Sequence, residues 1–114
     1  MALKYTGERD QQWVQQLTAQ AGQFSDPVII PGFVTRIAAY VYPGIGGSAT
    51  LQFTGEPEED VVDNPGGIPW LDWDIGAVTS NKACAAFGEM TAVRLKAVAQ
   101  MATARIVGHK TIRR

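Results

Sequence analysis

Two carboxylates that lie two residues apart, Asp72 and Asp74, are the first candidates for chemistry in this sequence. A pair of carboxylates can hydrolyse a glycosidic bond when the two groups flank the bond that breaks. On one face of a β-strand the two would stand about 6–7 Å apart, because each residue advances a strand by about 3.3 Å. Carboxylates with this spacing are common in strands, so the pair alone does not indicate an enzyme.

Five more acidic residues lie close together in one stretch, and they are Glu56, Glu58, Glu59, Asp60 and Asp63. Their oxygens could bind calcium, which prefers carboxylate ligands. The EF-hand pattern requires acids at alternate positions around a central glycine, and this stretch lacks that pattern. We therefore interpret residues 56–63 as an exposed acidic loop, and the sequence leaves calcium binding there open.

Nucleophilic or metal chemistry would have to use Cys84 and His109, the only cysteine and the only histidine. Cys84 lies among small residues in KACAAF, which is typical of a small core residue rather than of a reactive thiol. One histidine and one cysteine are too few for a zinc or copper site, and a single cysteine cannot form a disulfide within the chain. We predict that the protein is not an enzyme and that it has no catalytic residue, no cofactor and no metal site.

Large apolar and aromatic side chains offer contacts of another kind. Trp13 and Leu17 lie four residues apart and form a narrow apolar stripe in a polar segment. Tyr40, Tyr42 and Trp70 are the candidate exposed aromatics, which could stack on sugar rings or be buried between subunits, where Trp and Tyr are enriched. We predict that a partner or a glycan contacts these five residues.

The charges balance overall but are unevenly placed along the chain. The formal net charge is −1 and the pI is about 5.7, which does not favour binding to nucleic acid. Acidic residues are concentrated in 56–74 and most basic residues lie from Lys82 onward. An acidic surface of one copy could therefore meet a basic surface of another, although two separately solvated surfaces would show the same pattern.

The sequence shows no run of apolar residues long enough to cross a membrane. Its N-terminus also lacks the apolar segment of a signal peptide. We therefore expect no membrane partner, and synthesis in a reducing cytoplasm.

A chain of 114 residues normally forms one domain. Residues 1–26 are polar, with glutamines around Trp13 and Leu17, and Gly22 follows this stripe. Helical spacing with a glycine at its end predicts a short helix or an arm. From Pro27 onward apolar residues alternate with polar ones, which is the period of a β-strand. We therefore expect an arm over 1–26 and a β domain over 27–114.

Two stretches of the expected β domain look alike. Thr35 in the first matches Thr91 in the second, 56 residues on, and Ala49 matches Ala102, 53 residues on. The offset changes in the turn, where an insertion costs little, and stays constant within each strand, where a slip would invert every side chain. We interpret residues 33–55 and 90–108 as two similar hairpins, although any two amphipathic hairpins share such a pattern.

Two such hairpins can cover each other's apolar faces, so the sequence predicts an all-β fold. We expect an antiparallel β-sandwich or a Greek-key or jelly-roll-like barrel. The residues expected in its core are Thr35, Ile37, Val41, Leu51, Phe53, Val93, Leu95 and Ile106. Trp73 is expected to be more buried than Trp70. Leu71 and Ile75 would lie on the same strand face as Trp73, since the three alternate along the chain.

The C-terminal stretch FGEMTAVRLKAVAQMATARIVG resembles the C-terminal strands of small structural proteins of tailed bacteriophages. In those proteins a Thr-Ala-Val/Leu-Arg-Leu phrase precedes a turn and a final strand, as residues 91–95 precede residues 102–107 here. The matching stretch covers about a fifth of the chain and carries no catalytic signature.

The resemblance implies a non-enzymatic β-sandwich protein of the virion that is made in the host cytoplasm. Such a protein decorates or stabilises the capsid, or forms part of a head fibre, neck or tail. The resemblance favours a homo-oligomer, either a trimer or a ring, that contacts other virion proteins such as the major capsid protein. A carbohydrate- or receptor-binding β-sandwich module is the alternative, so a glycan is kept among the expected partners.

Overall fold

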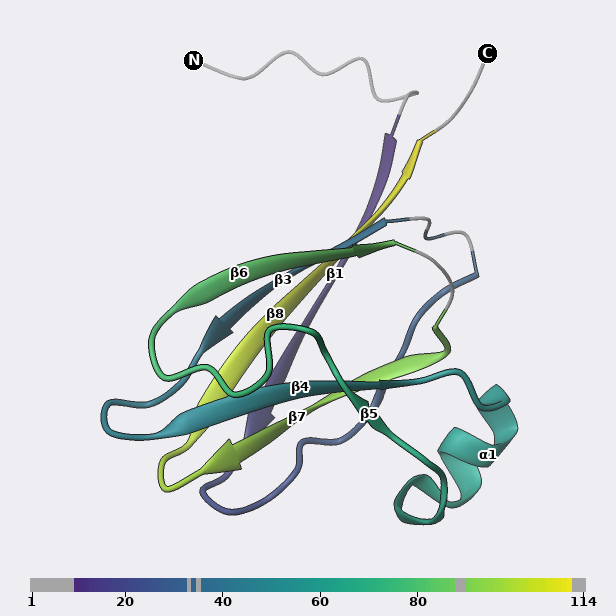
Figure 1. The fold of residues 1–114 in the computed structure, drawn as a ribbon. Coiled ribbons are helices and arrows are strands. Elements are labelled where there is room, and N and C mark those ends of the chain that lie inside the picture. The colour runs from purple at the N-terminus through teal and green to yellow at the C-terminus, as the bar shows by residue number, and fades with distance from the viewer. Residues whose placement is uncertain (1–9, 33, 35, 88–89, 112–114) are drawn as a thin grey trace, which may run out of the picture.

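The computed structural model describes residues 10–111 except 33, 35, 88 and 89, and it consists mainly of two antiparallel sheets (Figure 1). Sheet A contains, in spatial order, β1 (Asp10–Ala19), β8 (Ala102–Thr111), β3 (Arg36–Tyr42) and β6 (Lys82–Phe87). Sheet B contains β2 (Val28–Ile29), β7 (Ala92–Val98), β4 (Ser48–Thr54) and β5 (Leu71–Asp72). Between β4 and β5 the chain forms α1 (Glu58–Asp63) and a short 3-10 helix (Pro65–Gly67).

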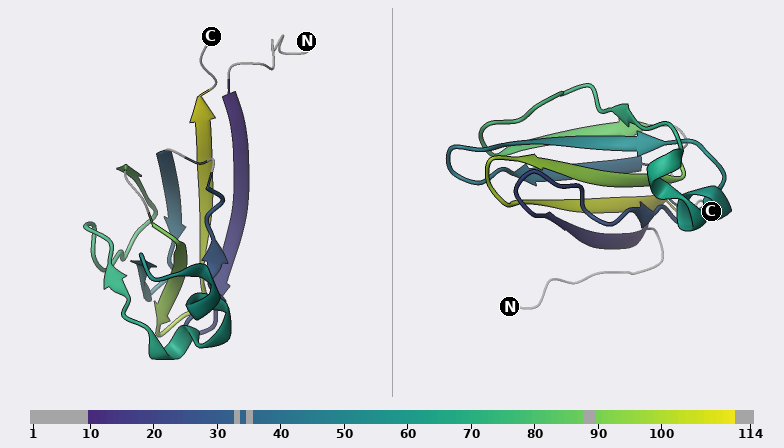
Figure 2. Two further views of the ribbon diagram at one scale, coloured as in Figure 1. Left: turned by 90° about the vertical axis from the view of Figure 1, so that its right-hand side faces the viewer. Right: turned by 90° about the horizontal axis from the view of Figure 1, so that it is seen from below.

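The strand orders β1-β8-β3-β6 and β2-β7-β4-β5 define the topology. Consecutive described strands lie in opposite sheets at every connection except the one from β4 to β5. An eight-stranded double sheet connected in this way is a jelly roll. The two sheets stack over one core (Figure 2), so the predicted antiparallel β-sandwich is confirmed. Neither helix in the described residues is long and apolar enough to span a membrane.

The two predicted hairpins are not hairpins, and this prediction was wrong. β3 pairs with β6 and β8, whereas β4 pairs with β5 and β7. The loop over 43–47 therefore carries the chain from one sheet to the other, and the apolar faces of β3 and β4 meet across the core. Alternation reveals that a strand has an apolar face, but it does not reveal whether the next strand pairs at its edge or packs on that face.

The two repeated stretches nevertheless occupy equivalent places in the fold. The first copy supplies β3 to sheet A and β4 to sheet B, and the second supplies β7 to sheet B and β8 to sheet A. β3 pairs with β8, and β4 pairs with β7. If the two repeated stretches were interchanged, β3 would take the place of β7 and β4 that of β8, so the pair β3–β8 would become the pair β7–β4. Each stretch therefore supplies one central strand to each sheet, and this is why the same pattern occurs twice in the chain.

The two crossing loops, 43–47 and 99–101, pack against each other. A Cβ atom on Gly44 would lie 2.6 Å from the Cβ atom of Gln100, and one on Gly47 would lie 2.8 Å from the same atom. These distances are shorter than real carbon contacts, so both glycines are required by close packing. The glycines of the 43–47 loop thus allow it to pack closely against the 99–101 loop of the second repeated stretch.

The core matches most of the sequence-based expectation. The fully buried members of the expected set are Ile37, Val41, Leu51, Val93, Leu95 and Ile106. Phe53 is partly buried and meets Trp73 edge to face, with 6.2 Å between ring centroids. Thr35 lies outside the described residues.

The expected greater burial of Trp73 than of Trp70 is confirmed, but of the two residues expected beside Trp73 only Ile75 packs against the core. Trp73 is 5% exposed, whereas Trp70 is only partly buried. Leu71 is 62% exposed and does not share the burial of Trp73, whereas Ile75 packs against the core as expected. The backbone N–H of Trp73 donates to the carbonyl of Leu51 at 2.8 Å, which holds the tryptophan at the edge of the core.

The expected N-terminal helix is also absent over the described part of residues 1–26. Asp10–Ala19 forms β1, which pairs with β8 along its whole length (Figure 1). A spacing of four places Trp13 and Leu17 on one face of a helix, but four is also even, so it places them on one face of a strand. Pairing with β8 selects the strand, and Leu17 and Ala19 enter the core.

Candidate functional site: the outer faces of the two sheets

The outer face of sheet A presents two tyrosines to solvent. Tyr40 and Tyr42 alternate with the buried Ala39 and Val41 on β3, so both tyrosines point away from the core. Tyr40 lies opposite Arg105 of β8, in the centre of the sheet. Tyr40 is 39% exposed and Tyr42 is 43% exposed, so much of each side chain is accessible to a ligand or a partner.

We call this surface the tyrosine face. Cross-strand register and alternation assign to it Val14, Gln16, Thr18, Arg36, Ala38, Tyr40, Tyr42, Ala83, Ala85, Thr103, Arg105 and Val107. None of these side chains is acidic, and the alanines beside the tyrosines are short. The face therefore combines exposed aromatic and apolar area with positive charge.

The outer face of sheet B carries an arginine held between two aromatic rings. The guanidinium carbon of Arg94 lies 3.8 Å from the centre of the Phe24 ring and 4.4 Å from that of the Trp70 ring. Phe24 comes from the segment that precedes β2, and Trp70 directly precedes β5. We call Phe24, Arg94 and Trp70 the arginine sandwich.

Hydrogen bonds fix the arginine sandwich. Arg94 Nε donates to Gln52 Oε1 at 2.8 Å, and Gln52 Nε2 donates to Asp72 Oδ1 at 2.8 Å. Arg94, Gln52 and Asp72 are successive cross-strand neighbours on β7, β4 and β5, so sheet register creates this row. Trp70 Nε1 donates to the carbonyl of Pro65 at 2.8 Å, which fixes the second ring.

Partial burial in this cluster lowers the pKa of the Arg94 guanidinium, because removal from water penalises the charged form. An arginine in a protein still remains protonated at neutral pH. The cluster therefore holds a partly desolvated cation whose described hydrogen-bond partner, Gln52, is neutral.

The structure separates the five residues that the sequence grouped as a contact site. Tyr40 and Tyr42 lie together on sheet A, whereas Trp70 lies on the other face of the molecule beside Arg94. Leu17 is only 2% exposed, so its place in the predicted contact site is wrong. Trp13 is partly buried, packs against the core, and lies 3.1 Å from the position that a Cβ atom on Gly108 would take.

Two members of the arginine sandwich were missed by sequence reasoning. Arg94 is one of the basic residues from Lys82 onward, and its cross-strand neighbour Gln52 is 42 residues away in the chain. Phe24 is 47% exposed in a connecting segment, outside any periodic pattern. The only available signal was an aromatic residue near a turn glycine, which does not identify its partner.

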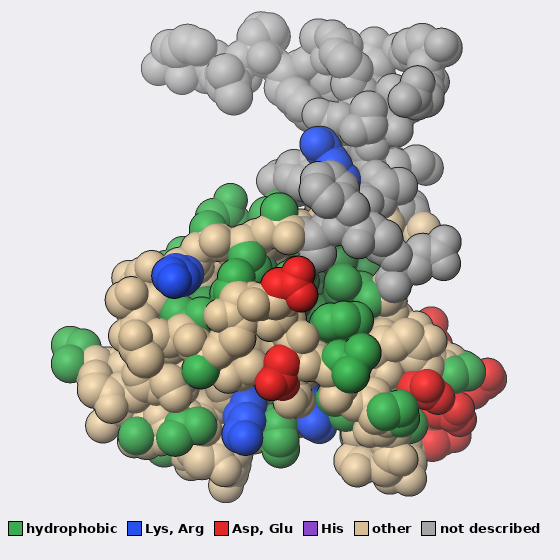
Figure 3. All heavy atoms as spheres, in the orientation of Figure 1, with side chains coloured by type: hydrophobic (Ala, Val, Ile, Leu, Met, Phe, Trp, Pro, Cys, Tyr) green, Lys and Arg blue, Asp and Glu red, His purple; other side chains and the backbone are tan. Residues whose placement is uncertain are grey.

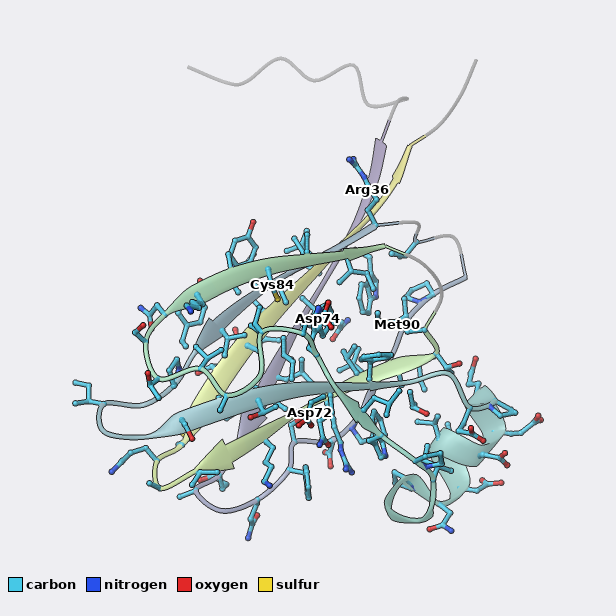
Figure 4. All side chains as sticks on the ribbon, viewed as in Figure 1. Arg36, Asp72, Asp74, Cys84 and Met90 are labelled. Atoms are coloured by element: carbon cyan, nitrogen blue, oxygen red, sulfur yellow. The ribbon has the colours of Figure 1, made fainter. Side chains whose placement is uncertain are left out.

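The residues considered for catalysis do not form a catalytic arrangement in the described part of the chain. Asp72 belongs to β5 and accepts a hydrogen bond from Gln52, whereas Asp74 follows the end of the strand (Figure 4). The two carboxylates therefore do not share a strand face as expected. Burial raises the pKa of the Cys84 thiol, which packs against the core from β6 (Figure 4) and is therefore not activated as a nucleophile.

The expected acidic loop over 56–63 is partly helical. Its carboxylates gather over α1, where Glu58, Glu59 and Asp60 occupy the first turn (Figure 3). Acidic residues suit a helix N-terminus because they oppose its positive dipole end, which explains the helix. Val61 is buried at 2% exposure and attaches α1 to the domain, while Val62 is 64% exposed. Among the described residues no group of three or more His, Cys, Asp or Glu is placed to hold a metal ion.

No protein-family model matches this chain, and no curated protein matches its sequence. Among solved structures, the chain is similar to a protein of the Bacillus endospore appendages, described as a novel family of disulfide-linked pili. The TM-score is 0.51, and the identity is 12% over 99% of this chain and 98% of that chain. A carbohydrate-binding module from the Cellvibrio mixtus lichenase 5A, solved with cellotriose, shows a TM-score of 0.35 and 18% identity over 93% of each chain. The first similarity shows a shared fold.

Proposed function

We propose that this chain is a non-enzymatic structural subunit that associates with copies of itself, as a trimer or a ring, through the tyrosine face. The observation that carries the proposal is the exposure of Tyr40 and Tyr42 beside Ala38 and Val14 on a face without acidic side chains in its described part. Exposed apolar patches of this kind are typical of surfaces that bind other proteins.

Association through this face would be driven mainly by burial of apolar and aromatic area. Each Å² of apolar surface removed from water contributes roughly 25 cal/mol. Tyrosine contributes a large ring together with a hydroxyl that can form hydrogen bonds at an interface, which makes it a common interface residue. Arg36 and Arg105 are both positive, so in a trimer or a ring the tyrosine face would meet a different, polar or acidic surface of the next copy rather than another tyrosine face.

The shared fold of the spore-appendage protein supports a structural role, since that protein is named for an assembled fibre. The mode of linkage must differ, however. The chain has one cysteine, Cys84, which is partly buried against the core. One thiol cannot link a chain to two neighbours, so this assembly would be held together by non-covalent contacts.

We further propose that the assembly belongs to the virion of a tailed bacteriophage, as a capsid decoration, a head fibre or a neck component. The support is the resemblance of residues 87–108 to strands of such proteins, now placed on β7 and β8 in the centre of the two sheets. Immunogold labelling of purified virions from cells that make the chain is the direct test. Labelled particles with a fixed copy number are expected, and unlabelled particles would contradict the assignment to the virion.

A second candidate function is glycan binding, and one observation favours it. Tyr40 and Tyr42 lie two positions apart on one strand face, about 7 Å along the strand, so two rings are available to stack on a sugar chain. Titration with oligosaccharides, followed by the tyrosine resonances in NMR spectra, distinguishes the two candidates. Saturable shifts confined to the tyrosine face would favour the glycan-binding module, whereas their absence in a self-associating protein would favour the structural subunit.

A further inference from the structure

We infer that the arginine sandwich is the receptor for the acidic helix α1 of a second copy of this chain. The inference rests on the proposed self-association and identifies a contact on sheet B in addition to the tyrosine face. It joins Arg94, which contacts Phe24 and Trp70, to the carboxylates of Glu58–Asp63.

The receptor side is held by contacts within its own copy. The guanidinium carbon of Arg94 lies 3.8 Å from the Phe24 ring centre and 4.4 Å from the Trp70 ring centre, and Gln52 accepts a hydrogen bond from its Nε. A guanidinium has five N–H donors, and within the described residues Arg94 uses Nε alone. Its terminal N–H groups are therefore available to a carboxylate, which an arginine can bind through two parallel hydrogen bonds.

The electrostatic state of Arg94 favours an anionic partner. The cation is partly removed from water, and in the described part of the chain no carboxylate is bonded to it directly. Asp72 is the nearest acid in the hydrogen-bonded row, and Gln52 stands between the two. Lys96 adds a second positive charge, with its Nζ 5.9 Å from the centre of the Phe24 ring.

The ligand side matches the receptor in charge and in apolar contact. The first turn of α1 presents Glu58, Glu59 and Asp60, and no basic residue follows in its last turn. Figure 3 shows these acids as one red surface over α1. Val62 is 64% exposed on the same helix, and the Phe24 ring at 47% exposure offers it an apolar surface.

We assign the contact to two copies rather than to one chain. Val61 is buried at 2% exposure and attaches α1 to its own domain, while Glu58, Glu59 and Asp60 are exposed and can meet a second copy. A net charge of −1 produces little long-range repulsion between copies. Local attraction between the acidic helix and Arg94 can therefore act as copies approach.

Two charge-reversal variants test this contact, and each leaves one of its sides intact. Arg94→Glu destroys the receptor, and Glu58→Lys together with Glu59→Lys destroys the ligand. Each variant alone is expected to associate at least about tenfold more weakly than the natural chain, because attraction becomes repulsion. A mixture of the two should regain a mixed complex, since the first variant keeps its acidic helix and the second keeps its Arg94. Sedimentation of the mixture, with one variant fluorescently labelled, measures whether the labelled variant enters a complex with the other.

Ile45→Glu is the control, because it adds a negative charge at a 99% exposed position in the loop over 43–47, outside the tyrosine face, the arginine sandwich and α1. It should leave association unchanged. The helix variant alters only exposed positions, so it decides the question even where circular dichroism shows that Arg94→Glu fails to fold. If each charge-reversal variant associates as well as the natural chain does, the α1 contact is overturned but self-association is not. Natural chains that remain monomeric would overturn both.

Discussion

The Arg94 guanidinium lies 3.8 Å from the Phe24 ring although the two residues stand 70 positions apart in the sequence. The contact fixes the segment before β2 on the outer side of β7. Backbone bonds follow the same path, since Ser25 N donates to the carbonyl of Leu95 at 2.7 Å. The segment around Phe24 and Ser25 thus lies along the β7 side of sheet B, held there by a cation–π contact and by backbone hydrogen bonds.

Removing either partner of this pair should cost stability in a coupled way. We expect a double-mutant cycle of Phe24→Ala and Arg94→Gln to show a coupling energy of about 0.5–1 kcal/mol, which is usual for an exposed cation–π contact. The Lys96 Nζ lies 5.9 Å from the same ring, so Phe24→Ala with Lys96→Gln should couple less. Urea unfolding of the four proteins in each cycle provides the measurement, and equal coupling in the two cycles would contradict the geometry.

Trp73 should be the most costly tryptophan to truncate. Trp73→Ala removes a buried ring that packs on Phe53, and we expect the free energy of unfolding to fall by about 3–5 kcal/mol. Leu71→Ala is the control two residues earlier, and it should change stability by less than about 0.5 kcal/mol because Leu71 is 62% exposed. Thermal or urea unfolding that ranked Leu71 above Trp73 would show that the segment after β5 is placed wrongly.

A methyl group on Gly47 should not fit where the crossing loops 43–47 and 99–101 pack against each other. A Cβ atom on Gly47 would lie 2.8 Å from the carbonyl oxygen of Val98 as well as from Gln100, so Gly47→Ala should destabilise by roughly 1–3 kcal/mol. Gly55→Ala is the control, since no atom lies within 4 Å of its added Cβ. A loss of stability in Gly55→Ala as large as that in Gly47→Ala would exclude steric contact as the cause.

Stability should decrease as the pH rises through the alkaline range because of Cys84. Burial raises the pKa of its thiol in the folded state, so the unfolded chain loses this proton first. The contribution is constant below the ordinary thiol pKa of about 8.5 and becomes unfavourable above it. Unfolding free energies at about pH 7 and about pH 10 in a reducing buffer should differ less for Cys84→Ala than for the natural chain. The same pH dependence in both proteins would argue against a desolvated thiol.

The features that depend on local pattern could be predicted from the sequence. Alternation identified the buried faces of β3, β4, β7 and β8, and six expected core residues such as Leu51 and Ile106 are fully buried. The equivalence of the two repeated stretches also follows from their constant offset within strands. A strand needs one apolar face wherever it lies in a sandwich, so the core residues are predicted correctly even though the hairpin pairing of β3 with β4 and of β7 with β8 is wrong.

The features that depend on distant partners could not be predicted. The spacing of Trp13 and Leu17 fits a helix and a strand equally well, and only the ladder with β8 decides between them. Likewise, Arg94 meets Phe24 and Trp70 because three separate segments converge on sheet B. No local pattern encodes such a convergence, so the candidate site on sheet B emerged only from the register of the strands.

The central claim is that copies of this chain associate through the tyrosine face, and sedimentation equilibrium at micromolar concentration tests it most directly. The natural chain should sediment as a trimer or a larger closed ring. Tyr40→Ser with Tyr42→Ser should shift it toward monomer, and Ile45→Ser, which removes a 99% exposed side chain from the loop over 43–47, should not. A natural chain that sediments as a monomer, or a double variant with the same mass as the natural chain, would contradict the claim.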